Sequence, residues 1–186
     1  MIIWLAGMSC VGKSTIMRNI ISKFPEGEKV RPTKYFDCIK FDNFITIGGR
    51  YYNKTTNPGS DYIFAGKDKF QDFITQEYPK HKKMLIEGSK FFRPEIISWL
   101  MDNNYKLKIY YLSTDINNLN QRAKNRGGWW DKKRTEKRTL SEIKRLEKIL
   151  TNKTFSSIIE QRTNETMEQS TELSLHITNM LMDKFT

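Results

Sequence analysis

The sequence lacks both the cysteines of a disulfide-built domain and the apolar runs of a membrane protein. Only two cysteines, Cys10 and Cys38, occur among 186 residues, too few for the disulfide framework of a small secreted domain. No apolar run reaches the roughly 18 residues that span a bilayer. The first residues carry neither the basic segment nor the small-residue cleavage site of a signal peptide. We therefore expect a cytoplasmic protein in a reducing compartment, without a membrane partner.

Histidines are also scarce, and acidic residues are fewer than basic ones. His81 and His176 stand alone, with no cysteine or second histidine at metal-ligand spacing, so zinc is not expected. Lysine and arginine number 32 against 21 acids, which gives a net charge of +11. Residues 122–153 hold twelve of these basic residues and four acids, a local net charge of +8. Such a segment is either a solvated helical face or a surface that binds phosphates, because charge determines partners rather than fold.

The apolar content is sufficient for a core, since 38% of the residues are hydrophobic and 12% are aromatic. At this length we expect one domain over residues 1–186. Short apolar runs predict strands at 2–6, 34–41, 83–88, 106–113 and 155–160, and amphipathic patterns predict helices at 14–24, 67–78, 94–103, 115–126, 139–150 and 166–184. This alternation predicts a three-layer α/β fold, with helices on both faces of a parallel sheet of about five strands. Residues 45–66 are predicted as an irregular insertion, and residues 127–138 as a loop or short basic lid.

The segment GMSCVGKS, residues 7–14, follows the first predicted strand and opens the first predicted helix. Gly7 and Gly12 allow a tight turn whose backbone N–H groups converge on an anion, and the helix adds its positive end. Lys13 can reach the β and γ phosphates of a nucleotide, and the Ser14 hydroxyl can bind Mg²⁺. The segment therefore predicts a P-loop for ATP and Mg²⁺, formed by Gly7, Met8, Ser9, Cys10, Val11, Gly12, Lys13, Ser14 and Thr15.

Three further segments carry a resemblance to a known family. The third predicted strand ends in LIEG, with Glu87 where a motor or signalling NTPase has Asp, and no guanine-selective Asn-Lys-x-Asp occurs. With the early P-loop and the late Arg-rich segment, the chain resembles the P-loop kinase superfamily, and within it the polynucleotide-kinase-like group. Besides the P-loop, the resemblance rests on KFDNF, EGSKFFRP and STDINNLNQRAKNRG.

This resemblance implies roles for several residues around the phosphates. Asp42 in KFDNF would be the general base for the acceptor hydroxyl, with Asp37 as a weaker candidate. The alternatives for Asp42 are a helix cap or a ligand of a magnesium-bound water. Arg122 and Arg126, four residues apart and thus on one helical face, would reach back to the phosphates together with Lys13.

It also implies residues for the metal, the base and the acceptor. Glu87 would orient a magnesium-bound water or support the P-loop. Arg162 and Asn164 would hold the adenine, unless they only begin the last helix. Ser89 and Arg93 in EGSKFFRP would contact the acceptor.

The acceptor itself is left open between classes of substrate. Aromatic and basic residues alternate in GGRYYNK and in GGWWDKKR, a pattern that suits nucleic acid because bases stack on aromatic rings and phosphates attract cations. The first hypothesis is a kinase of nucleic acid, above all DNA, acting on a 5′-OH end or on a hydroxymethylated uracil base. The composition suggests a phage or other viral source, hence the host cytoplasm. The alternatives are a kinase of a free nucleoside or nucleotide and a non-enzymatic ATP-binding module. The residues predicted to bind the acceptor are Arg50, Tyr51, Ser89, Arg93, Trp129, Trp130 and Arg134.

Overall fold

The computed structural model describes residues 1–42, 44–47, 65–125 and 132–183, with the side chains of residues 47 and 132–139 left out of the description. The strands are β1 (Ile2–Gly7), β2 (Glu28–Thr33), β3 (Phe36–Lys40), β4 (Phe44–Ile47), β5 (Lys83–Glu87), β6 (Leu107–Ser113) and β7 (Ile159–Thr163). The helices are α1 (Lys13–Ile21), α2 (Lys67–Glu77), the 3₁₀ turn η2 (Tyr78–Lys80), α3 (Pro94–Asp102), α4 (Ile116–Asn125), α5 (Lys132–Leu150), α6 (Lys153–Ser156) and α7 (Met167–Met182).

All seven described strands belong to one sheet, in the order β2-β3-β4-β5-β1-β6-β7. The five strands β4, β5, β1, β6 and β7 run parallel. The strands β2 and β3 add an antiparallel hairpin at one edge of the sheet. The central strand β1 reads as an unbroken apolar run because helices cover both of its faces, and every residue of it is buried.

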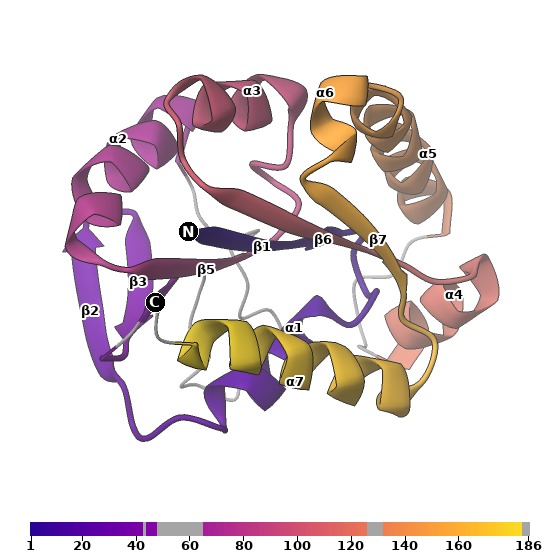
Figure 1. The fold of residues 1–186 in the computed structure, drawn as a ribbon. Coiled ribbons are helices and arrows are strands. Elements are labelled where there is room, and N and C mark those ends of the chain that lie inside the picture. Colours follow the sequence, from indigo (N-terminus) through magenta and orange to yellow (C-terminus); the bar gives the residue numbers. More distant parts are fainter. Residues whose placement is uncertain (43, 48–64, 126–131, 184–186) are drawn as a thin grey trace.

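Two layers of helices enclose the sheet (Figure 1). On one face, α1 and α7 pack over Ile3 and Leu5 of β1. On the opposite face, α2, α3, α5 and α6 cover the alternate residues Ile2 and Trp4. This alternation follows from the two-residue period of a strand, which sends successive side chains to opposite faces. The predicted three-layer α/β fold with a mostly parallel sheet is confirmed.

Several element boundaries differ from the predictions. The strand predicted at 34–41 is β3, which is antiparallel, and the second parallel strand is β4, which overlaps the start of the predicted insertion. The sequence pattern missed β2 because this edge strand is largely exposed and has no apolar alternation. Residues 132–138, predicted as part of the lid, are the first turns of α5, since Lys, Arg and Glu favour helix. The last strand begins at Ile159 because Phe155 belongs to α6.

The connections locate a crevice at the carboxyl ends of the central strands. From β1 the chain passes through α1 toward the β2–β4 edge, whereas from β5 it passes through α3 and crosses β1 to reach β6. Two neighbouring parallel strands thus send their connections in opposite directions, which is where open α/β sheets bind ligands.

Among the described residues, no helix has both the length and the apolar character that a bilayer crossing requires.

Candidate active site

The P-loop has the backbone geometry of an anion-binding turn, and only glycine fits at two of its positions. Gly7 has φ +139°, and a Cβ there would lie 2.5 Å from the carbonyl oxygen of Leu112. Gly12 has φ +100°, and a Cβ there would collide with the side-chain amide of Asn164. Both angles lie in the left-handed region that disfavours other residues. The loop therefore closes tightly onto α1, which begins at the next residue.

Lys13 spans the start of the P-loop. Its Nζ donates hydrogen bonds of 2.8 Å to the carbonyl oxygens of Gly7 and Met8, and the residue is only 5% exposed. Among the described residues these bonds engage two of the three ammonium protons, so the third can serve a phosphate oxygen. The ammonium group of Lys13 is thus fixed beside the backbone of the P-loop.

Ser14 and Glu87 form the part of the site that suits a magnesium ion. The Ser14 hydroxyl lies 3.5 Å from Oε1 of Glu87, and Glu87 is 3% exposed at the end of β5. Trp4 fixes the turn that follows, because its indole N–H donates to the Gly88 carbonyl at 3.0 Å. Magnesium is usually held by one or two carboxylates with substrate phosphates and several waters, so one hydroxyl and one carboxylate fit this ion. Within the described chain, no cluster of three or more His, Cys, Asp or Glu side chains offers an all-protein metal cage.

A clamp of two side chains holds the far side of the P-loop. The Asn164 amide donates to the Val11 carbonyl at 2.6 Å and accepts from the Ser170 hydroxyl at 2.7 Å. The Arg122 guanidinium donates to the carbonyls of Val11 at 3.3 Å, Asn164 at 2.9 Å and Glu165 at 2.8 Å. These bonds tie α4 and the β7–α7 connection to the loop. Asn164 and Arg122 thus hold the P-loop in position.

Arg122, Arg162 and Asn164, which are predicted to contact the nucleotide, make contacts within the protein. Asn164 lies against the P-loop, where its amide is turned to the loop and to Ser170, and the residue is 2% exposed. Arg162, at the end of β7, forms an ion pair with Glu160. That these residues hold the adenine, and that Arg122 reaches a phosphate, both stay predictions.

The predicted position of Asp42 beside the P-loop is wrong. Asp42 lies between the antiparallel β3 and the parallel β4, just before Phe44, which is level with the first residue of β5. The last residue of β5 is Glu87, so four residues of strand, roughly 13 Å, separate Asp42 from the carboxyl edge. An exposed carboxylate at the amino edge cannot act as base for a reaction at Lys13 and Ser14.

Asp37, the weaker candidate, lies at the correct edge. The strand register places it level with Glu87 and two strands away, roughly 10 Å across the sheet. Its carboxylate accepts from Arg31 through both oxygens, at 2.7 and 3.4 Å. Arg93 follows the β5 turn and begins α3, where it is exposed, donates from Nε to the Lys90 carbonyl and pairs with Glu95. The acceptor role of Arg93 stays a prediction.

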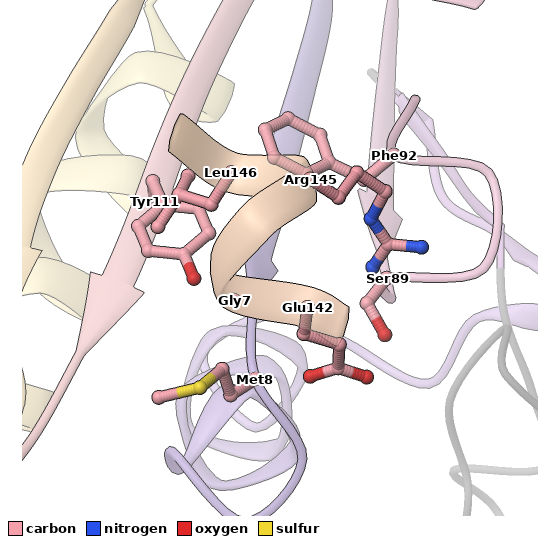
Figure 2. Close-up of a pocket in the computed structure, with 8 residues that line it drawn as sticks. All are labelled: Gly7, Met8, Ser89, Phe92, Tyr111, Glu142, Arg145 and Leu146. Atoms are coloured by element: carbon pink, nitrogen blue, oxygen red, sulfur yellow. The ribbon is translucent and has the colours of Figure 1, made fainter. Parts of the chain in front are cut away.

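A hollow opens under α5 beside the first two P-loop residues. Six side chains around it are Ser89, Phe92, Tyr111, Glu142, Arg145 and Leu146, and we call it the α5 hollow. Figure 2 shows α5 lying over the hollow, with Tyr111 entering from β6 and Ser89 from the turn after β5. Of these residues the sequence analysis named only Ser89. The other five could not be predicted as one group, because only the packing of α5 against β6 brings them together, although the +8 segment contained Arg145.

The remaining predicted site residues lie outside the described part of the chain. This holds for Arg50, Tyr51, Arg126, Trp129 and Trp130, and also for the side chain of Arg134. A groove lined by aromatic and basic residues therefore stays a prediction.

Comparison with known proteins assigns no family to the chain. No family model matches the sequence, and no curated protein matches it. Among solved structures, the crystal structure of a gluconokinase from Sinorhizobium meliloti 1021 aligns with 96% of this chain and 94% of its own, at 12% identity and a TM-score of 0.47. At this identity the similarity assigns neither a family nor a substrate to the chain.

Proposed function

We propose that the protein is an ATP-dependent phosphotransferase with an alcohol group as acceptor. The observation that carries the proposal is the fixed trio of Lys13, Ser14 and Glu87 around a glycine-bounded anion nest. Phosphoryl transfer depends on positioning and on positive charge rather than on covalent chemistry of the protein, and this trio supplies both. We expect ATP and Mg²⁺ as cofactors.

The transfer step follows from this geometry. The acceptor oxygen forms a bond to the γ-phosphorus while the bond from that phosphorus to the bridging oxygen breaks, and ADP leaves with the electron pair. Lys13 stabilises the charge that develops on the γ-phosphoryl oxygens. Ser14 and Glu87 would hold Mg²⁺, which would supply positive charge against the phosphates of the nucleotide. The hydroxyl proton passes to a carboxylate at this edge, for which Asp37 and Glu142 are the candidates in place of Asp42.

The acceptor that the described residues suit best is a small hydroxyl-bearing molecule. It would bind beside the α5 hollow, which lies against Gly7 and Met8 and is covered by α5. Nucleic acid remains the second candidate on one specific observation, the +8 charge of residues 122–153, half of whose basic residues lie between 126 and 138. A DNA acceptor would present either a 5′-OH end or a hydroxymethylated base extruded from the helix.

A transfer assay with γ-labelled ATP tests the function and separates the acceptors. The panel holds 5′-OH DNA, hydroxymethyluracil DNA, free nucleosides and small hydroxylated metabolites. Label is expected in a small acceptor with the wild type and in none with Lys13→Ala. Transfer to oligonucleotides alone would favour the second candidate. Transfer by Lys13→Ala at the wild-type rate would refute the phosphotransferase proposal.

A further inference from the structure

The α5 hollow contains polar groups that the nucleotide site does not use. Tyr111 is 4% exposed, yet its hydroxyl makes no hydrogen bond within the described chain. Thr114 Oγ1 is the one side-chain polar atom that the described residues leave both sealed from solvent and unpaired. The Tyr111 hydroxyl is therefore not sealed, and Figure 2 shows it at the hollow.

The hydroxyl of Tyr111 is a hydrogen-bond donor at neutral pH. Burial, with a smaller contribution from Glu142, raises the pKa of Tyr111 to about 12. Because this hydroxyl reaches the hollow and has no partner among the described residues, it is available to donate to a ligand there.

Arg145 is the second group without a partner. It is half-buried on α5, and its guanidinium forms no hydrogen bond or ion pair with the described residues. Figure 2 shows this guanidinium on the same side of the hollow as the Ser89 hydroxyl. The planar fork of an arginine matches the two oxygens of a carboxylate or phosphate. The Glu142 carboxylate lines the same hollow, so a bound anion would share it with this side chain.

We propose that the α5 hollow binds an oxyanion of the acceptor, a carboxylate or a phosphate monoester, through the Arg145 guanidinium and the Tyr111 hydroxyl. The acceptor is then a small hydroxylated anion whose free hydroxyl lies toward Lys13. This inference rests on the proposed function and names the substrate class of the same site. The walls formed by Phe92 and Leu146 are apolar, which strengthens the pairing of charges between them.

The size of the hollow limits what enters it. The cavity volume is about 10 Å³, room for about one water molecule. An oxygen of the oxyanion has this size, so the hollow takes the charged end of the acceptor and the remainder lies outside it. A whole nucleotide does not fit there.

Binding measurements on matched probes test the proposal. Glycerol, D-glycerate and glycerol 3-phosphate share a hydroxylated skeleton and differ in carrying no anion, a carboxylate or a phosphate. They are titrated calorimetrically while a non-hydrolysable ATP analogue with Mg²⁺ fills the P-loop, so that the nest cannot bind them. We expect at least one anion to bind roughly 10-fold or more tightly than glycerol, the scale of a hydrogen bond to a charged group. The anion that binds more tightly shows whether the acceptor carries a carboxylate or a phosphate monoester.

Two variants and a matched control assign the effect to the hollow. Arg145→Met and Tyr111→Phe are each expected to lose most of the preference for the anion while the ATP analogue binds as in the wild type. Lys144→Met removes a neighbouring, exposed cation of the same helix and should change neither affinity. Melting temperatures check that all three variants are folded.

Three outcomes overturn the proposal. The first is that glycerol binds as tightly as both anions. The second is that anion binding is unchanged in Arg145→Met. The third is that the two variants weaken binding of the ATP analogue, which would assign the hollow to the γ-phosphate. These outcomes are separate from a failure of the proposed function. That failure is the absence of transfer to every acceptor, whereas the titration measures binding alone.

Discussion

Replacing Asn164 by alanine distinguishes the clamp that the structure shows from the adenine contact that the sequence predicts. The change removes hydrogen bonds of 2.6 Å to the Val11 carbonyl and 2.7 Å from the Ser170 hydroxyl. Two buried hydrogen bonds at about 1 kcal/mol each, with a small cavity, lower the free energy of unfolding by about 2–4 kcal/mol. For a domain of this size, the melting temperature falls by roughly 5–12 °C.

Nucleotide affinity provides the second readout of the same variant. A loosened P-loop should bind ATP and GTP less tightly by the same factor, because the loop contacts phosphates that the two share. An adenine-reading amide would instead change the ratio of the two affinities. Ser170→Ala serves as the graded control, since it removes one of the two bonds and should show about half of the destabilisation. The reasoning is refuted if Asn164→Ala unfolds within about 0.5 kcal/mol of the wild type, the range of surface substitutions.

Three other substitutions test separate parts of the structure. Asp42→Asn should leave the transfer rate unchanged in steady-state assays. In the same assays, Glu142→Gln or Asp37→Asn should slow transfer by roughly 100-fold, the lower range of a lost general base. A slow Asp42→Asn variant would contradict the strand register. Gly12→Ala should abolish ATP binding in calorimetric titrations, because its φ of +100° and the Asn164 amide exclude a methyl group, while Gly66→Ala, at an ordinary φ of −77°, should bind normally. Lys83→Met should lower the free energy of unfolding by about 2–4 kcal/mol in urea titrations, since the 2% exposed ammonium donates to the carbonyls of Met180, Leu181 and Asp183 at the end of α7. The exposed Lys82→Met is its control, and equal stabilities would show that the carbonyls find water instead.

The sequence predicted the parts of the site that local patterns determine. The run from Ile2 to Ala6, the glycines of the P-loop and the amphipathic α1 are neighbours along the chain, so their strand–loop–helix arrangement follows from spacing alone. The position of Glu87 at the end of a buried strand was predicted for the same reason.

The parts that failed depend on strand direction and on distant contacts. A pattern of apolar residues does not show whether a strand runs parallel or antiparallel, so Asp42 was assigned to the carboxyl edge although β3 reverses there. Tyr111 resembles any buried strand residue, and Arg145 resembles any exposed helical cation. Only the packing of α5 against β6 brings these two side chains to one hollow.

The destination of the γ-phosphoryl group tests the central claim most directly. Phosphorus NMR follows ATP and Mg²⁺ with the protein in the presence of hydroxylated carboxylates and phosphate monoesters. The account predicts that ATP signals convert to those of ADP together with a new phosphomonoester resonance, and that Lys13→Ala produces neither. Conversion of ATP to ADP and inorganic phosphate alone, with every acceptor unchanged, would contradict it.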